Sequence, residues 1–435
     1  MTEAATIPLG SKRRPGEQAL AAHGPKMENN AIRNWPFIAK AQGVRAFRGA
    51  CAGIPGVVIG AGPSLDLDIQ LLKGLQDKCL LVCTDRALKA VLPHGIRPHI
   101  VCSADMDVDL VKLYDHLDIP SDLIMCFDRD AYHPVVAHWP GPMVTYDTAF
   151  DAHLWGRMFT GLKGFMHKNL SVGHTAYYFA ALAGCSTIML VGIDNAFPGT
   201  HTHAKGTSDV DGGVIDPAVP TWTVTKDVHG NDVRSSPGFT EYAKAFGRAI
   251  PEQRIPVINC TPIGAHIDGA PHMRFEEALK IHATETHDIK AIMKSCMALP
   301  VQPFDVERFT AHYDNIIPQL EACKRQAEFG MTQLRQAERV DRRKHPNEFA
   351  RKVHKTGETM KRIAENLFIQ SLIGKVMFKG QFIMEHYEES MKGLEKMDAS
   401  RLWMAAARME MFFLAERDSC EIFIEALQNV RDRVA

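Results

Sequence analysis

The residues of this sequence that are best suited to chemistry follow short apolar runs, with one polar group after each run. Each run is typical of a buried β-strand, and parallel strands bring their carboxyl ends to one edge of a sheet, where ligands of open α/β folds bind. We therefore expect these groups to share one ligand crevice. Ser, Thr and Asp are also preferred helix caps, which is the structural alternative for any single group. The groups are Gly60-Ala61-Gly62-Pro63-Ser64, Thr84-Asp85-Arg86, Ser103-Ala104-Asp105, Asp128-Arg129-Asp130, Gly192-Ile193-Asp194-Asn195 and Asn259-Cys260-Thr261.

The first group is a glycine-rich turn inside the stretch GVVIGAGPSL, residues 56–65. Gly60 and Gly62 allow the backbone to approach a ligand, and Pro63 stops the preceding strand. Ser64 can begin a helix whose free N–H groups and dipole favour an anion. The turn lacks the Lys-Ser/Thr of a Walker loop and the third glycine of the dinucleotide fingerprint. It predicts a site for a nucleotide phosphate, with a packing turn as the alternative.

A second glycine motif, SVGHTAYYFAALAGC, begins at Ser171 and leads into an alanine-rich helix. The helix N-terminus around Gly173 and Thr175 can accept a phosphate or a carboxylate. His174 titrates near neutral pH and could act as an acid or as a phosphate ligand. The alternative is a tightly packed helix with Ser or Thr as its cap.

The elements that must position these groups alternate between strand and helix from Gly56 to about His282. Such alternation predicts a Rossmann-like α/β fold, in which helices cover both faces of a mostly parallel sheet. Helical stretches fall between most strands, among them residues 65–78 and 174–185. The expected strands are GVVIG (56–60), CLLVCT (79–84), HIVCSA (99–104), LIMCF (123–127), PMVTY (142–146), TIMLVGI (187–193) and PVINC (256–260).

Two later regions depart from this rhythm. Residues 195–240 are polar and rich in Gly and Pro, which is typical of a functional lid or a disordered loop. Beyond about residue 300 the strand-like runs end, and apolar residues recur at helical spacing. We expect a helical domain of about four helices there, with stripes such as Trp403, Met404 and Met411 in its core.

Length and composition set the domain organisation and the broad class. With 435 residues, the chain is long enough for roughly two or three domains. We expect a mobile N-terminal tail and lead-in helices at 1–50, a Rossmann-like domain at 51–290 and an all-α domain at 300–435. The hydrophobic fraction of 46% is ordinary for a soluble globular protein, and the net charge of −1 gives no reason to expect nucleic-acid binding.

Cysteine usage and hydropathy indicate a cytoplasmic protein. The ten cysteines form no CxxC pair, and Cys83, Cys102 and Cys126 fall inside apolar runs, where Cys acts as a small hydrophobe. This usage fits a reducing compartment and predicts neither a disulfide framework nor a zinc site. No apolar run approaches the ~18 residues of a membrane span, and the polar N-terminus lacks a secretory signal. The oligomeric state stays open.

Five of these motifs, in this order, resemble the Maf (motility-associated factor) family of flagellin glycosyltransferases. The resemblance covers roughly residues 30–285, and the helical C-terminal region is also like that of Maf proteins. Maf proteins share their core domain with archaeal 6-hydroxymethylpterin diphosphokinase-like proteins. The first motif and the later GxD element (residues 192–194) are also similar to bacterial sialyltransferases that use CMP-sugar donors. The motifs are GAGPSL, TDRAL, SAD, SVGHTAYYFAALAGCSTIMLVGID and VINCTPIGAHIDG.

The resemblance implies transfer of a nonulosonic acid, such as pseudaminic or legionaminic acid, from a CMP donor to Ser or Thr hydroxyls of flagellin. In the sialyltransferases a histidine beyond the GxD element assists phosphate departure or proton transfer, and His201 and His203 are the nearest equivalents here. With the edge groups, the resemblance gives the catalytic candidates Asp105, Asp194, His174, His201 and His203. The expected donor-binding residues are Gly60, Gly62, Pro63, Ser64, Asp85, Arg86, Ser171, Gly173, Thr175, Asn259 and Thr261.

Transfer from a CMP-linked sugar needs donors that stabilise the departing phosphate and a base for the acceptor hydroxyl. Asp105, Asp194 and His174 are candidates for the base. Because CMP leaves with a single phosphate, we expect no cofactor and no metal ion, with the CMP-activated sugar as co-substrate.

Two alternatives stay open. The first is a Mg²⁺-dependent diphosphokinase or metal-dependent transferase, for which the carboxylates of Asp105 and Asp107 directly after a strand could hold the ion. The second is a non-catalytic flagellin-binding chaperone, in which the helical C-terminal region would dock a partner helix.

Overall fold

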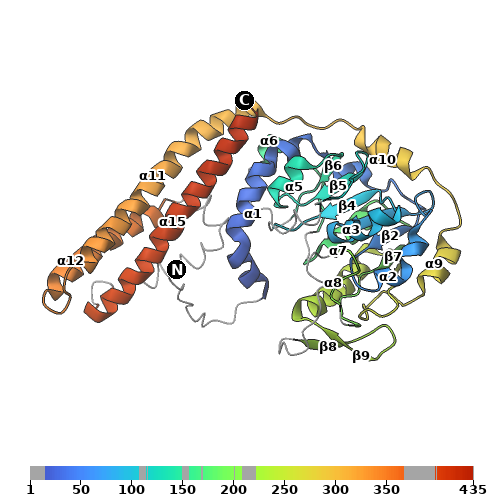
Figure 1. Cartoon of the computed structure of the whole chain (residues 1–435). Helices are drawn as coiled ribbons and strands as arrows, with labels where there is room; N and C mark the ends of the chain where they lie inside the picture. The colour runs from blue at the N-terminus through green and yellow to red at the C-terminus, as the bar shows by residue number, and fades with distance from the viewer. Residues whose placement is uncertain are drawn as a thin grey trace. The chain divides into compact units, whose positions relative to one another are not determined.

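A computed structural model provides the architecture of the chain, which falls into two compact units (Figure 1). One unit is residues 34–305 and contains the sheet. The other combines residues 1–33 with residues 306–435. The structure describes residues 15–106, 114, 116–148, 156–167, 170–199, 201–207, 222–366, 397 and 399–434.

The larger unit is built on an eight-stranded sheet of order β1-β6-β5-β4-β3-β2-β7-β10, in which every neighbouring pair is parallel. After β2 the chain adds β3 to β6 on one side, and β7 then returns to pair with the opposite side of β2. The reversal of strand order therefore lies between β2 and β7. The strands are β1 Gln42–Gly43, β2 Gly56–Ile59, β3 Leu80–Thr84, β4 Ile100–Ser103, β5 Ile124–Phe127, β6 Met143–Thr145, β7 Ile188–Val191 and β10 Val257–Asn259.

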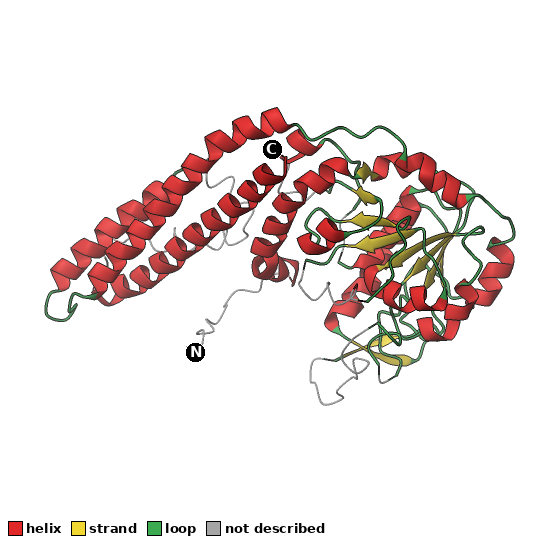
Figure 2. Ribbon diagram, turned by 45° about the horizontal axis from the view of Figure 1, so that its top comes forward, coloured by secondary structure: helices red, strands yellow, loops and turns green. Residues whose placement is uncertain are grey.

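Both faces of this sheet are covered. Successive side chains of a strand point to opposite faces, yet every residue of β2, β3, β4, β5 and β7 is buried. Helix α7 packs on β2 to β4, and Figure 2 shows helices on both sides of the strands. The predicted Rossmann-like fold is confirmed. The helices of this unit are α2 Leu65–Asp68, α3 Asp85–Val91, α5 His133–His138, α6 Arg157–Thr160, α7 Val172–Leu182, α8 Pro237–Gln253, α9 Phe275–His282 and α10 Ile289–Met297.

In three regions the structure adds elements that the sequence did not indicate or shortens an expected one. The expected tail and lead-in region contains a helix, α1 Pro15–Lys40, followed by β1 at the sheet edge, whereas residues 1–14 lie outside the described part. The expected helix at 65–78 is a single turn, α2, continued by a 3₁₀ turn at Ile69–Leu72. The expected lid contains an antiparallel hairpin, β8 Thr223–Lys226 with β9 Asp232–Ser235. Its strands alternate in exposure, so a half-buried ribbon was hidden by its many polar residues.

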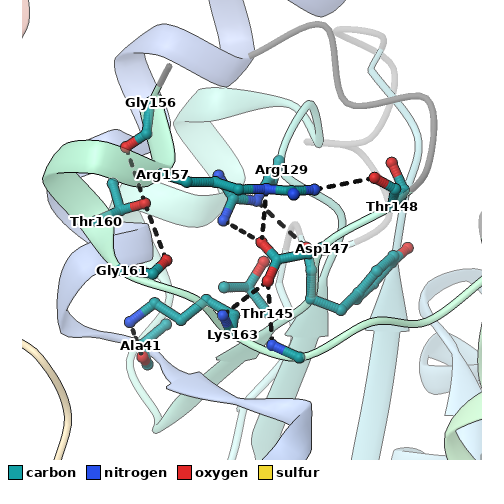
Figure 3. A network of polar contacts seen from close by, with 12 residues as sticks. Ala41, Arg129, Thr145, Asp147, Thr148, Gly156, Arg157, Thr160, Gly161 and Lys163 are labelled. Carbon is teal, nitrogen blue, oxygen red and sulfur yellow. Dashed lines mark hydrogen bonds and ion pairs between the residues drawn. The ribbon is translucent and has the colours of Figure 1, made fainter. Parts of the chain in front are cut away.

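A buried cluster of charged groups ties the carboxyl ends of β5 and β6 to the start of the unit (Figure 3). The Asp147 carboxylate pairs with Arg129 at 2.5 Å and with Arg157 at 3.4 Å, and it accepts from the backbone amide of Lys163 at 2.8 Å. The Lys163 ammonium donates to the carbonyls of Ala39 and Ala41, at 3.1 and 2.9 Å. Burial, followed by repulsion from Arg129, lowers the pKa of Lys163 to about 8.

The second unit is helical where the structure describes it, as predicted for the C-terminal region. Helices α11 Val306–Glu338, α12 Pro346–Ala364 and α15 Ala399–Val434 contact one another pairwise. One part of the predicted core is wrong, because Trp403 and Met404 are 51% exposed. Trp403 instead carries the Arg342 guanidinium over its ring at 5.2 Å, which shows how an exposed aromatic can mimic a core stripe in sequence.

The predicted role of cysteine as a buried hydrophobe is confirmed, since all ten cysteines are buried and free. Among the helices described, none combines the length and the apolar character that a membrane span requires.

Candidate functional site

A cavity of about 210 Å³ opens at the carboxyl ends of β2, β3, β4 and β7, on both sides of the strand-order reversal. This is the position at which ligands bind in open α/β sheets. Its walls contain residues of four of the six edge groups, whereas the groups at 128–130 and 259–261 do not line it. The predicted site residues that line it are Gly60, Gly62, Asp85, Arg86, Asp105, Ser171, Gly173, Asp194 and His203.

The glycine-rich turn brings the tips of β2 and β7 into very close contact. A Cβ atom at Gly60 would lie 2.9 Å from the carbonyl carbon of Gly192, and one at Gly192 would lie 3.1 Å from the carbonyl carbon of Gly60, with each carbonyl oxygen closer still. The amide of Gly62 donates to Gly192 at 2.8 Å, and the amide of Gly60 donates to Val191 at 2.8 Å. Both Gly60 and Gly192 are therefore required by the backbone contact itself, whatever ligand is bound.

Asp194 at the end of β7 holds the rest of the turn. Its carboxylate accepts from the Ser64 amide at 2.8 Å and from the Ser64 hydroxyl. Burial raises the pKa of Asp194 to about 6, against the opposing effect of these two hydrogen bonds. The amides of Gly60, Gly62 and Ser64 are thus engaged within the protein. Phosphate binding by this turn stays a prediction, and its hydrogen bonds match the alternative of a packing turn.

The N-terminus of α7 offers the amides that the first turn does not. Ser171, Val172 and Gly173 line the cavity, and the first amides of a helix have no acceptor within it. The carbonyl of Ser171 is used by the amides of His174 and Thr175, at 3.1 and 3.4 Å. Amides and dipole together favour an anion at this wall.

His174 lies behind this wall and does not line the cavity. Its Nε2 faces the Tyr242 carbonyl at 3.2 Å and must donate to it, so Nδ1 accepts from the Ser171 hydroxyl at 2.7 Å. The imidazole also stacks on Phe246, with ring centroids 3.9 Å apart. Burial lowers the pKa of His174 to about 4. The ring is therefore neutral near pH 7, and it links α7 to α8 rather than facing a ligand.

Asp85 and Asp105 supply carboxylates on the β3–β4 side. Asp85 is 4% exposed, and its Oδ1 accepts from the Arg86 amide at 2.8 Å. Burial raises the pKa of Asp85 to about 6, opposed by that hydrogen bond and reinforced by the charge of Asp105. Asp105 is exposed and reaches the cavity from the end of β4. One buried and one exposed carboxylate in a cleft are typical of acid–base sites.

His203 and Arg86 add cationic and donor groups to the same cavity. The imidazole of His203 shares a hydrogen bond with the Thr202 hydroxyl at 2.9 Å. Burial, followed by the charge of Arg86, lowers the pKa of His203 to about 4. A bound substrate anion would raise the pKa of His203 and favour the protonated imidazole. His201 is exposed and lies outside the cavity lining.

An aromatic wall from α8 is absent from the residues predicted by the sequence. Phe239, Tyr242 and Phe246 line the cavity at spacings of three and four residues, which puts them on one face of the helix. Burial, followed by the charge of Asp105, raises the pKa of Tyr242, so the phenol lies within electrostatic range of that carboxylate. The signal was available, because these aromatics recur at helical spacing directly after the long polar stretch.

Other predicted residues do not reach the cavity. Pro63, Ser64 and Thr175 are absent from its lining. Asn259 instead accepts from the Thr261 amide and hydroxyl, at 3.1 and 2.5 Å, and donates to Ala265. In the group at 128–130, Arg129 belongs to the buried charge cluster of Figure 3, and Asp128 accepts from the Tyr146 hydroxyl at 3.0 Å.

No three His, Cys, Asp or Glu side chains converge as a candidate metal site in the described part of the chain. Asp107, the second carboxylate of the magnesium alternative, falls outside the described residues.

Comparison with known proteins adds two findings to this geometry. Residues 29–200 match the family model described as 6-hydroxymethylpterin diphosphokinase MptE-like. The core of this chain resembles that family. The MptE-like segment contains β1 to β7 and most of the cavity lining, whereas α8 and its aromatic wall lie beyond it. A comparison with proteins of curated function found no match.

The fold is similar to that of the MAf glycosyltransferase from Magnetospirillum magneticum AMB-1, with a TM-score of 0.54 at 15% sequence identity. The match covers 94% of this chain and 58% of that protein. This chain therefore spans about 58% of the length of that neighbour. At this identity the likeness is one of fold. Together the two findings confirm the predicted resemblance to Maf proteins with an MptE-like core.

Proposed function

We propose that this protein is a glycosyltransferase that moves a nonulosonic, sialic-acid-like sugar from a CMP donor to Ser or Thr hydroxyls of flagellin. The single observation that carries the proposal is the cavity at the strand-order reversal, with helix amides on one wall and carboxylates on another. The similarity in fold to a MAf glycosyltransferase supports the reaction class. On this proposal the protein serves flagellum assembly and motility, and it works in the cytoplasm.

The walls suggest how the donor would lie. The phosphate would be held at the N-terminus of α7 by the amides of Val172 and Gly173, close to the donors of Arg86 and His203. Ligand pockets usually measure about 300–1,000 Å³, so a cavity of about 210 Å³ holds only part of a nucleotide sugar. We place the scissile bond inside it and the remainder of the donor toward its mouth.

The reaction breaks the bond between the sugar carbon and the phosphate oxygen, and the electron pair leaves with CMP. The acceptor hydroxyl bonds to the same carbon and loses its proton to a base. Of the three base candidates from the sequence, Asp194 has both oxygens engaged by Ser64, and His174 lies behind the cavity wall. Asp105 is then favoured as the base, and its carboxylate would also stabilise the positive charge that develops on the sugar.

The decisive experiment is intact-mass spectrometry of flagellin from cells with and without this protein. A mass increment that is lost on deletion and restored by the wild-type gene would identify both the acceptor and the sugar class. Complementation with Asp105→Asn should fail, whereas Asp268→Asn, at an exposed carboxylate, should restore the increment. Unchanged flagellin mass on deletion would refute the proposal.

The match to the MptE-like family model supports a second candidate function, that of a Mg²⁺-dependent diphosphokinase. Thermal shift with CMP, CTP and ATP, each with and without Mg²⁺, separates the two. Stabilisation by CMP without metal supports the transferase. Stabilisation by ATP with Mg²⁺ alone supports the kinase.

A further inference from the structure

Three aromatic side chains of α8 form one wall of the cavity, and the proposed reaction does not use them. Phe239, Tyr242 and Phe246 lie on one face of the helix, at spacings of three and four residues. The helix follows the segment at 29–200 that matches the MptE-like family model, so the match does not cover this wall. The aromatic wall is therefore a place where this chain can set its own choice of ligand.

The aromatic wall lies directly beside the helix amides that we propose for the phosphate. A Cβ atom at Gly173 would lie 3.8 Å from Cζ of Phe246, so the two walls are within van der Waals range of each other. His174 fixes them together, because its Nε2 donates to the Tyr242 carbonyl and its Nδ1 accepts from the Ser171 hydroxyl. A nucleotide whose phosphate binds the amides of α7 therefore has its remaining groups within reach of α8.

Tyr242 and Phe239 are the members of this wall that a ligand can reach most easily. Phe246 is fully buried, and the His174 imidazole stacks on it with ring centroids 3.9 Å apart. Phe239 and Tyr242 are half-buried and line the cavity. The Tyr242 ring meets Phe239 at 41° and His174 at 85°, so neither of these neighbours lies parallel to it. Their partial exposure agrees with a ligand group that lies toward the mouth of the cavity.

A nucleobase is the part of a nucleotide sugar that suits such a wall. It is planar with an apolar π-face on each side, and bases stack on Tyr and Phe rings in many proteins that bind nucleic acids. A sialic-acid-like sugar carries hydroxyl groups and a carboxylate around its ring, which need hydrogen-bond partners when they are buried. We propose that Tyr242, together with Phe239, forms the stacking site for the base of the nucleotide donor. This inference rests on the proposed function, in which the base is cytosine.

The test compares CMP with ribose 5-phosphate, which has the same sugar phosphate and no base, as ligands of the full chain. In isothermal titration, wild type should bind CMP about tenfold more tightly than ribose 5-phosphate, the size expected for one base stacked on an aromatic side chain. Tyr242→Leu should raise the dissociation constant of CMP by about tenfold and leave that of ribose 5-phosphate unchanged. Tyr242→Phe keeps the ring and should keep both constants close to those of wild type.

Phe239→Leu provides a second variant, and it should weaken CMP binding in the same selective way. Phe329→Leu is the matched control, because Phe329 of α11 is 53% exposed and does not line the cavity, and it should leave both dissociation constants unchanged. An equal loss of affinity for CMP and ribose 5-phosphate in Tyr242→Leu would overturn the inference, because the ring would then support the phosphate wall only. Unchanged affinity for CMP in that variant would overturn it as well, and the proposed function would still stand.

CMP-N-acetylneuraminic acid separates the base from the sugar. If Tyr242→Leu lowers only the affinity that this donor has beyond that of CMP, the aromatic wall binds the sugar, and the inference is wrong. If wild type binds ATP with Mg²⁺ and not CMP, the proposed function fails, and the affinity for ATP against that for inorganic triphosphate decides the role of Tyr242. If wild type binds none of these ligands, both proposals fall.

Discussion

Replacing Asp194 by Asn tests whether this carboxylate supports the glycine-rich turn or performs chemistry. Both oxygens of Asp194 accept from Ser64, and an Asn side chain can keep this pairing. Its Oδ1 would accept from the Ser64 amide, and its Nδ2 would donate to the Ser64 hydroxyl, which can reverse its role. The substitution removes a buried charge and preserves the shape of the site.

The effect on stability should depend on pH with a defined sign. Burial raises the pKa of Asp194 from 3.8 to about 6, so between these values the folded state binds more protons than the unfolded state. Stability that involves this group therefore falls as pH rises through that window. This difference in pKa between the folded and unfolded states corresponds to a loss of stability on the order of 3 kcal/mol at pH 7. Loss of charge-assisted hydrogen bonds in Asp194→Asn would offset about 1 kcal/mol of that amount.

Urea unfolding of wild type and Asp194→Asn at pH 4 and pH 7 measures this difference. We expect the variant to match wild type or fall slightly below it at pH 4, and to exceed it by about 2 kcal/mol at pH 7. The CMP-induced thermal shift should persist in the variant. A variant that is less stable than wild type at pH 7, or a difference that does not change with pH, would refute a purely supporting role for Asp194.

Gly60→Ala should lower the free energy of unfolding by at least about 2 kcal/mol, because its Cβ would meet the Gly192 carbonyl. Gly238→Ala should be nearly neutral in the same urea titration, because its Cβ would make only an ordinary contact with the Ser236 hydroxyl at 3.9 Å. Between pH 8 and 10.5 the free energy of unfolding of wild type should rise relative to that of Lys163→Met, because the lowered pKa of Lys163 means that the unfolded state binds more protons there. Free energies of the two proteins that change in parallel across that pH range would contradict this. His174→Ala should lower the free energy of unfolding by about 2–4 kcal/mol in thermal unfolding and weaken CMP binding. His174→Gln, whose side chain can donate and accept, should recover part of the stability and part of the binding. Equal CMP binding by wild type and both variants would refute a positioning role for His174.

The sheet was predictable because its signals are local. Apolar runs such as residues 80–84 bounded by polar groups define buried strands, and all seven expected strands occur in the structure. The two-residue strand β1 was missed, since it carries no periodicity and is held by pairing with β6. The hairpin β8–β9 was missed because its neighbours are rich in Gly and Pro and its alternation is irregular, with the apolar Val224 on the exposed side at 68% exposure.

The cavity was predictable as a place, and the roles within it were not. Parallel topology alone brings Asp85, Asp105 and Asp194 to one edge, which the alternation of strand and helix already implied. Whether a carboxylate faces a ligand or a neighbouring amide depends on distances of a few ångströms between distant segments. Asp194 meets Ser64 across 130 residues of sequence, and His174 meets Tyr242 across 68. No spacing rule encodes such pairs.

The contact between Gly60 and Gly192 limits which amides of the glycine-rich turn are open to a ligand. In many α/β folds the first glycine-rich turn receives the phosphate at the strand-order reversal. In this protein the strand tips touch there and consume the amides of Gly60 and Gly62. On the proposed function, we therefore expect the phosphate at the helix amides of α7, near the carboxylates beyond β3 and β4. Asp85, Asp105 and the α8 aromatics line that part of the cavity, whereas both carboxylate oxygens of Asp194 accept from Ser64.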